Sequence, residues 1–178
     1  VYTSLVVPEL GVMFDAGMPL RQFAAIDDVL ISHGHADHVG GIVGWLGMRG
    51  LNRRGRARVF APPSVAKDLE IALTAMSRLQ RYDLSVDFVP MEPGDDVPFT
   101  KGNRLRAFRT HHSVPSIGYQ IYKRVPKLKA EFLGLPGHEI DARKKAGEDL
   151  FDIEERLELA YATDTLSPDQ LDDLFRPD

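Results

Sequence analysis

The sequence predicts an α/β protein with a single domain. Short apolar runs rich in β-branched residues alternate with amphipathic helical patterns along most of the chain. The 178 residues are enough to bury a substantial core within one domain, which we expect to span 1–178. A hydrophobic fraction of 43% and a charged fraction of 27% are ordinary for a globular protein.

The first third of the chain predicts three strands and two helices. A turn at 8–10, which contains a proline, separates the first two strands and gives a hairpin. A helix begins near Asp37 or His38, because apolar residues from Val39 onward recur at helical intervals. Its glycines are poor helix formers, so we expect them to pack closely against their surroundings. The strands are expected at 3–7, 11–14 and 29–31, and a short helix at 19–25.

The rest of the chain predicts a long helix, further strands and a final helix. Pro62-Pro63-Ser64 starts the long helix, since proline is tolerated in a first turn, and Ser167-Pro168 starts the final one. Between 123 and 149 the strand pattern fails, and prolines and glycines interrupt a mostly polar segment, which predicts a long functional or mobile loop. The strands are expected at 57–61, 86–89, 97–99, 105–110, 117–122 and 157–162.

Composition excludes several classes of protein. The chain has no cysteine, which removes disulfides and thiolate metal sites and is typical of intracellular proteins. No apolar run approaches the roughly 18 to 20 residues that a membrane span requires, and no leader peptide is visible, so we expect a cytoplasmic protein. The chain starts at Val1 and not at Met, so an upstream piece is expected to be missing.

A candidate metal site follows the third strand. His33, His35, Asp37 and His38 fall within six residues. Imidazole and carboxylate groups are ligands of zinc and related metals, and several must converge on one point. His33 and His35 flank the flexible Gly34 and can both turn inward from a non-helical backbone, while Asp37 and His38 face a second metal. The alternative is a histidine-rich surface loop, and four potential ligands in so short a stretch argue against it.

Charge is distributed unevenly along the chain. The formal net charge of −4 argues against a general polyanion binder, because non-specific affinity for nucleic acids scales with basic contacts. Two basic clusters depart from this average, and each is either part of a basic rim around the metal site or a solvated face. They are Arg49, Arg53, Arg54, Arg56 and Arg58 in the first, and Lys123, Arg124, Lys127 and Lys129 in the second.

The His-x-His-x-Asp-His sequence resembles the signature of the metallo-β-lactamase superfamily. The resemblance implies an αβ/βα four-layer sandwich, in which two mixed sheets pack face to face, helices cover the outside and the metals lie at one edge. It implies that Asp15, which precedes a glycine at the end of the second strand, orients the histidine-rich loop; Asp15 is also typical of a turn aspartate that caps its own backbone. Thr163-Asp164-Thr165 resembles the superfamily's Gly-Asp-Thr, which implies that Asp164 bridges both metals.

A further ligand is expected from His111-His112, which directly follows a strand. Two adjacent side chains cannot point the same way from an extended chain, so one must be chosen. The stretch that ends in Gly118-Tyr119 resembles the ribonuclease Z family, in which the ligand lies seven residues before the tyrosine. The resemblance selects His112 and leaves His111 as a supporting or core histidine.

The resemblance to ribonuclease Z extends from Asp15 to Asp164 and is strongest to the short, plant-type form. Lys127 to Ile140 is similar to a segment of that form that reads as a basic stretch, Gly-Leu, a small residue, Gly and Glu-Ile. The family supplies a last metal-binding histidine beyond the Gly-Asp-Thr strand, but no histidine follows His138 here. We therefore expect the C-terminal part of the domain to be missing after Asp178.

The resemblance implies a zinc-dependent phosphodiester hydrolase, an endonuclease that removes the 3′ trailer of precursor tRNA. Two Zn²⁺ ions are expected, with Mn²⁺ or Fe²⁺ as alternatives, and the chain is expected to form a homodimer. Asp37 is also the expected catalytic proton acceptor, and Lys127, Lys129 and Gly137 are expected to contact RNA. The implied metal ligands are His33, His35 and His112 for one ion, Asp37 and His38 for the other, and Asp164 between them.

Two other functions fit the same residues. A small-molecule hydrolase of this fold, such as a cyclic-nucleotide phosphodiesterase or an arylsulfatase-like enzyme, would use the same metal site. A non-catalytic binding or scaffold protein would be favoured if the complete protein also lacked the last histidine.

Overall fold

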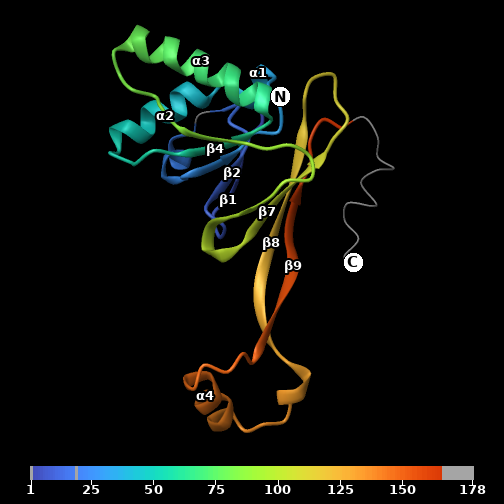
Figure 1. The fold of residues 1–178 in the computed structure, drawn as a ribbon. Coiled ribbons are helices and arrows are strands. Elements are labelled where there is room, and N and C mark those ends of the chain that lie inside the picture. The colour runs from blue at the N-terminus through green and yellow to red at the C-terminus, as the bar shows by residue number, and fades with distance from the viewer. Residues whose placement is uncertain (1, 19, 166–178) are drawn as a thin grey trace.

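The computed structural model describes residues 2–18 and 20–165. Two sheets pack face to face, and helices cover the outer face of the first sheet (Figure 1). The prediction of an α/β sandwich is confirmed, and the described residues form its helix layer and its two sheet layers. The helix predicted from Ser167 lies outside the described residues.

The first sheet has five strands in the order β1-β2-β3-β4-β5. β1 and β2 form the predicted antiparallel hairpin, whereas β2 to β5 run parallel because a crossover connects each pair. Phe14, Leu30 and Phe60 stand in one row across neighbouring strands and are almost completely buried. The strands are β1 (Leu5–Val7), β2 (Val12–Phe14), β3 (Asp28–Leu30), β4 (Arg58–Ala61) and β5 (Asp87–Pro90).

The helices cover this first sheet through one apolar core, in which Trp45 is the largest buried side chain. The helix predicted after the third strand occurs in two parts, which Gly40-Gly41 separates. The long helix begins at Pro63 as predicted and ends before Arg81, whose φ of +54° turns the chain. The helices are the 3-10 helix η1 (Arg21–Ala25), α1 (Ala36–Val39), α2 (Ile42–Leu51) and α3 (Pro63–Gln80).

A second core fills the space between the two sheets. Phe14 and Phe60 of the first sheet pack there with Leu105 and Tyr119 of the second. Tyr119 is fully buried, and its hydroxyl donates to main-chain oxygens, 2.8 Å from that of Ile31 and 3.1 Å from that of Phe60. The buried phenol therefore has partners at the carboxyl ends of β3 and β4.

The second sheet is antiparallel throughout, in the order β6-β7-β8-β9. On its outer face Arg106 forms ion pairs with Asp96 and Glu155, and its guanidinium lies 4.1 Å from the centre of the Tyr122 ring. These four residues join all four strands. The strands are β6 (Asp96–Pro98), β7 (Arg104–Arg109), β8 (Ile117–Leu128) and β9 (Phe151–Tyr161), with the 3-10 helix η2 (Thr100–Gly102) after β6.

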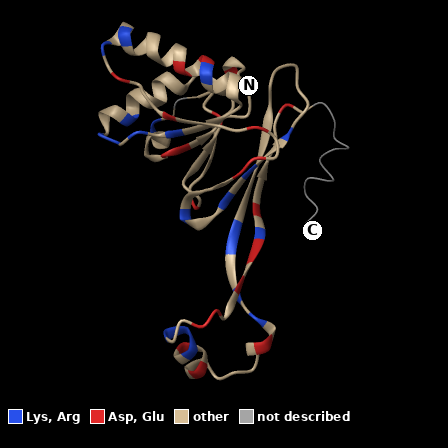
Figure 2. Ribbon diagram, in the orientation of Figure 1, with Lys and Arg blue, Asp and Glu red and all other residues tan. Residues whose placement is uncertain are grey.

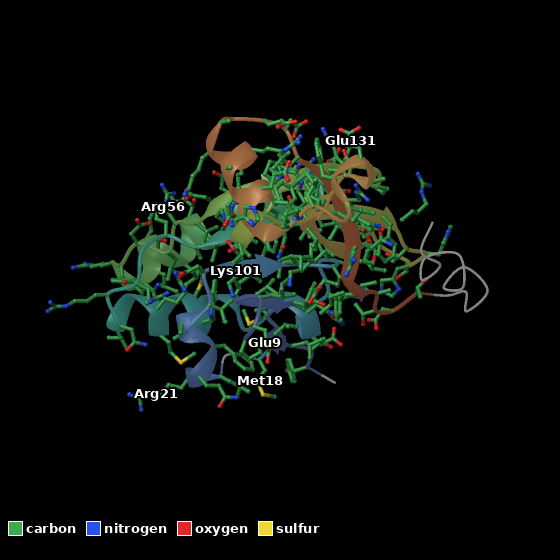
Figure 3. The ribbon with its side chains drawn as sticks, turned by 90° about the horizontal axis from the view of Figure 1, so that it is seen from below. Glu9, Met18, Arg21, Arg56, Lys101 and Glu131 are labelled. Atoms are coloured by element: carbon green, nitrogen blue, oxygen red, sulfur yellow. The ribbon has the colours of Figure 1, made fainter. Side chains whose placement is uncertain are left out.

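The two sheets are also tied together at the turn of the first hairpin. Lys101, in η2, donates through Nζ to the main-chain oxygen of Glu9, and both residues lie on the side of the body that Figure 3 presents. This contact joins the β1–β2 turn to the loop between β6 and β7.

Beyond Tyr122, β8 and β9 leave the body as a two-stranded arm (Figure 1). The arm corrects the prediction of a long loop at 123–149, because β8 continues to Leu128 and its tip holds the 3-10 helix η3 (Ala130–Phe132) and α4 (Gly137–Lys145). A ribbon with both faces exposed needs no apolar alternation, so the strand pattern stops where the sheet does not. In the described part of the chain, no helix is long and apolar enough to cross a membrane.

Candidate metal centre

Three segments far apart in the sequence meet at one edge of the sandwich. His33 follows the carboxyl end of β3 and pairs with Ser116 through an isolated antiparallel bridge. This bridge places the loop before β8 beside the histidine-rich loop. β9 runs next to β8 and ends at Tyr161, which brings Asp164 to the same edge.

The first ligand group comprises His33, His35 and His112. Nδ1 of His35 lies 3.1 Å from Nε2 of His33 and 3.1 Å from Nε2 of His112. A tetrahedral zinc ion with Zn–N bonds of about 2.0–2.1 Å has its ligand nitrogens roughly 3.3 Å apart. The three imidazoles therefore fit a common zinc ion.

The second ligand group shares His33 and adds His38 and Asp164. Oδ2 of Asp164 lies 3.1 Å from Nε2 of His38 and 3.6 Å from Nε2 of His33. The carboxylate thus lies between an imidazole of the first group and one of the second, which suits a bridging ligand. Oδ2 of Asp37 is 3.8 Å from Nε2 of His38 at the outer side of this group.

Asp15 is completely buried behind these ligands, with a φ of +56°. Its carboxylate accepts from the main-chain N–H of Ser32 at 2.7 Å, from the Ser32 hydroxyl, from Nδ1 of His38 at 2.8 Å and from the Tyr161 hydroxyl at 2.8 Å. A carboxylate is only an acceptor, so Nδ1 of His38 carries the proton and Nε2 keeps its lone pair for a metal.

Ser32 extends this orientation to His33. The Ser32 hydroxyl donates its one proton to Asp15, and its oxygen lies 2.9 Å from Nδ1 of His33, which must then be the donor. Nε2 of His33 is left free for a metal. Asp15 therefore fixes the ring tautomers of His38 directly and of His33 through Ser32.

Gly17 allows this buried network to lie close to the ligand loop. A Cβ atom at Gly17 would lie 1.8 Å from the main-chain oxygen of Asp37, so no larger residue fits. The same oxygen accepts the N–H of Thr3 at 2.8 Å, which holds α1 against the segment that precedes β1.

The electrostatics favour a neutral imidazole at His33. Burial, together with the neighbouring His38, lowers the pKa of His33 to about 4. The pKa of His38 is raised by its hydrogen bond to Asp15. Burial raises the pKa of Asp164, but the Thr163 hydroxyl and the nearby imidazoles outweigh it and lower the pKa below its ordinary value.

The structure places His111 and His112 differently. His112 points to the first ligand group, whereas His111 is exposed and its main-chain N–H donates to the Thr165 hydroxyl at 3.4 Å. The core alternative for His111 is therefore wrong, and its supporting role stays a prediction. His111 and Arg109 instead line an open cavity beside His112.

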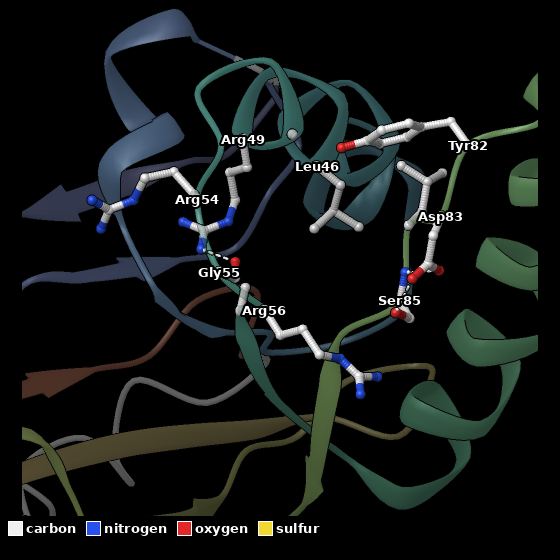
Figure 4. Close-up of a pocket in the computed structure, with 11 residues that line it drawn as sticks. Leu46, Arg49, Arg54, Gly55, Arg56, Tyr82, Asp83 and Ser85 are labelled. Atoms are coloured by element: carbon white, nitrogen blue, oxygen red, sulfur yellow. Dashed lines mark hydrogen bonds between the residues drawn. The ribbon is translucent and has the colours of Figure 1, made fainter.

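The arginine cluster does not form a basic rim around the metal centre. Arg58 starts β4 and pairs with Asp28, which starts β3, so both lie at the opposite end of the sheet from His33. Arg49 and Arg54 pair with Asp27 at 2.8 Å each. Figure 4 shows the pocket beside them, where Arg49 is turned toward the main-chain oxygen of Gly55.

The predicted RNA contacts lie on the arm. Lys127 pairs with Glu154 at 3.2 Å, Lys129 pairs with Asp149 at 2.8 Å, and Gly137 is the first residue of α4. β8 has 12 residues, so at about 3.3 Å per residue its far end is roughly 40 Å from the metal centre. These residues are therefore remote from the metal ligands, and basic and acidic residues both lie along the arm (Figure 2).

Sequence reasoning missed two residues of the site, Ser32 and Tyr161. Ser32 is the one polar residue at the end of an apolar strand, directly before the first histidine, and this position was its signal. Tyr161 precedes Asp164 by three residues and reads as an ordinary strand aromatic. Its contact with Asp15 spans 146 positions and has no local signature.

The fold and the two ligand groups define a class of protein, the β-lactamase superfamily. Residues 7–135 match the family described as "Beta-lactamase superfamily domain". The fold also resembles the crystal structure of human tRNase Z, short form, with a TM-score of 0.51 and 18% identity over 66% of this chain and 56% of that one.

Two proteins of similar sequence identify the family within this superfamily. The "Nuclear ribonuclease Z" of Triticum aestivum is 34% identical over 148 residues, 83% of this chain and 84% of that protein. The "tRNase Z TRZ2, chloroplastic" of Arabidopsis thaliana is 33% identical over 170 residues, 96% of this chain and 48% of that protein. The chain belongs to the ribonuclease Z family, which confirms the resemblance stated from sequence. It spans about half the length of the Arabidopsis relative.

Proposed function

We propose that this chain carries the catalytic centre of a zinc-dependent phosphodiester hydrolase that removes the 3′ trailer of precursor tRNA. The main support is the convergence of His33, His35 and His112 on one point, with Asp164 between that group and His38. The names of the relatives add the substrate class, since each is called a ribonuclease Z or tRNase Z. We also propose a homodimer in the cytoplasm.

The donor set fits two borderline divalent ions. His33, His35 and His112 would hold one ion, and Asp37 and His38 the other, with Asp164 as the shared ligand. When bound, such ions polarise the scissile phosphate and lower the pKa of water. Buried neutral His33 needs no proton loss to act as a ligand, which favours binding near neutral pH.

The protein itself supplies orientation and proton transfer. Asp15 and Ser32 hold the rings of His38 and His33 in one tautomer, so their lone pairs face the reaction space without reorganisation. Asp37 keeps 42% of its side chain exposed beside His38, where it can accept a proton from the attacking water. Arg109 lines the adjacent cavity and is suited to contact an RNA phosphate.

The arm is suited to select the RNA. Lys127, Lys129 and Gly137 remain proposed contacts, although both lysines are already paired with acidic residues of the arm. In the described residues no ion pair involves Lys144 or Lys145, in the last turn of α4. Lys144 lies over the Phe151 ring, with its Nζ 5.8 Å from the ring centre, so neither lysine gives up an ion pair when it binds phosphate.

The proposal is tested with precursor tRNA that carries a 3′ trailer. The purified protein loaded with Zn²⁺ should cut once at the end of the mature tRNA, lose this activity with a chelator and regain it with Zn²⁺. A small chromogenic phosphodiester is the second substrate. Hydrolysis of the small diester without cleavage of the RNA would contradict the proposal and favour a small-molecule hydrolase.

A further inference from the structure

Tyr161 connects the arm strand to the buried side of the metal centre. It is the last residue of β9, and its hydroxyl donates to Oδ2 of Asp15 at 2.8 Å. Its ring stacks on Phe14 with 4.5 Å between ring centres and an angle of 26°. Burial raises the pKa of the phenol, so the hydroxyl stays protonated and can only donate to the carboxylate.

The oxygen that Tyr161 contacts is the one that holds His38. Nδ1 of His38 lies 2.8 Å from Oδ2 of Asp15, and the Ser32 hydroxyl lies 2.9 Å from the same atom. Asp15 is completely buried, so its charge is stabilised only by such donors. The strength of the hydrogen bond between His38 and Asp15 therefore depends on the hydrogen bond that Tyr161 donates to the same carboxylate oxygen.

We propose that Tyr161 is a positioning residue, which sets the orientation and donor strength of the His38 imidazole through Asp15. The inference rests on the proposed function, because it takes the His38 group to be a metal site. Among the described residues, the Tyr161 hydroxyl bonds Asp15 and none of the proposed metal ligands. Its effect should therefore fall mainly on the ion held by His38, which Asp15 contacts directly, and less on the ion held by His35 and His112, which Asp15 reaches through Ser32 and His33.

Tyr119 offers a matched control. It lies opposite Tyr161 on the neighbouring strand β8, and its hydroxyl is also buried and hydrogen-bonded. Its acceptors are the main-chain oxygens of Ile31 and Phe60 and not Asp15. Tyr119→Phe thus removes a buried phenolic hydrogen bond in the same core without changing the donors to Asp15.

The experiment compares metal binding of the wild type, Tyr161→Phe and Tyr119→Phe by titration with Co²⁺ and Zn²⁺. In Tyr161→Phe the dissociation constant of the ion at His38 should rise about 10-fold, at the low end of the 10- to 100-fold that is typical when a direct partner of a metal ligand is lost, because Tyr161 acts through Asp15. The ion at His35 and His112 should stay within a few-fold. Tyr119→Phe should lower the melting temperature and leave both constants within a few-fold of the wild type.

Equal metal binding by the two variants would overturn the inference, because Tyr161 would then be a packing residue only. The same result with intact RNA cleavage in the wild type would leave the proposed function standing. Selective weakening of the ion at His38 in Tyr161→Phe, in a protein that does not cleave precursor tRNA, would support the inference and contradict the proposed function.

Discussion

Nδ1 of His38 lies 2.8 Å from Oδ2 of Asp15, deep behind the two ligand groups. The pair joins α1 to the end of β2, and its geometry leaves one imidazole nitrogen of His38 free to bind. Four donors, including this ring and Tyr161, face the carboxylate. The buried carboxylate of Asp15 thus orients Ser32, His38 and Tyr161 through hydrogen bonds to one group.

Asp15→Asn should weaken metal binding strongly. An amide has one acceptor oxygen, and its NH2 group would face a donor, so at least one buried partner loses its hydrogen bond. We expect metal affinity to fall about 10- to 100-fold and the free energy of unfolding to fall by about 1–3 kcal/mol. Asp87→Asn, an exposed change at the opposite end of the sheet, is the control and should leave metal affinity unchanged. Unchanged affinity in Asp15→Asn would contradict the role given to this carboxylate.

Metal content follows from the two ligand groups. Elemental analysis of the purified protein in metal-replete buffer should find close to two zinc or similar ions per chain. Chelation should lower the melting temperature, because an ion that binds only the folded state stabilises it by mass action. Fewer than one ion per chain would exclude the ligand assignment.

Substitution of the adjacent residues His111 and His112 should have very different effects on hydrolytic activity. His112→Ala removes a nitrogen 3.1 Å from Nδ1 of His35 and should abolish hydrolysis of a generic phosphodiester. His111→Ala removes an exposed ring and should lower it only modestly. Rates with a chromogenic diester measure both. The reverse order would show that the choice of His112 is wrong.

Lowering the pH should remove the stability that the ion pairs of Asp96 give to the second sheet. Burial raises the pKa of Asp96, but hydrogen bonds from Arg106 and Arg104 outweigh it and hold the pKa below its ordinary 3.8. Because the folded pKa is the lower one, this stabilisation is complete above pH 3.8 and is lost as pH falls through the folded value. We expect Asp96→Asn to cost about 0.5–1 kcal/mol near neutral pH, and the difference from wild type to shrink below pH 3.8 in urea titrations. A difference that stays constant down to pH 2 would contradict this account.

The local parts of the site could be predicted, and the long-range parts could not. The ligand loop at 33–38 has a dense local pattern, so its chemistry is visible in the sequence. Ser32 and Tyr161 act only through Asp15, and their contacts depend on how three segments fold together. No spacing rule reports such a contact.

The arm and the arginine cluster are two further features that could not be predicted from the sequence. The exposed half of β8 has no buried face, so the alternation that marks a strand is absent from Lys123 onward. The arginines look like one basic patch in sequence, but Asp27 and Asp28 neutralise Arg49, Arg54 and Arg58 from the neighbouring strand end. A count of charges along a chain cannot show which of them are paired in space.

Shortening the arm should separate the two hydrolytic activities. Ions at the centre act on a single phosphate, whereas selection of a folded RNA requires contacts far away, and the tip of the arm is roughly 40 Å from His33. We expect replacement of 126–153 by Asn-Gly, which favours a tight hairpin turn, to leave hydrolysis of a small chromogenic diester within a few-fold. Cleavage of precursor tRNA should fall by far more.

The charge contribution of the tip can be measured without deleting it. Changing both Lys144 and Lys145 to Ala should weaken RNA cleavage. A plot of log binding constant against log salt concentration should also become less steep, by about 0.7–0.9 for each lost phosphate contact. Lys127→Ala is the comparison within the arm: Lys127 is also a proposed contact, but it is already paired with Glu154, so its loss should have a smaller effect. Binding measured from low to high salt gives both slopes. Unchanged salt dependence in the double variant would exclude α4 from RNA recognition. For the protein with the shortened arm, equal loss of diester hydrolysis and RNA cleavage would mean that the arm supports the metal centre itself.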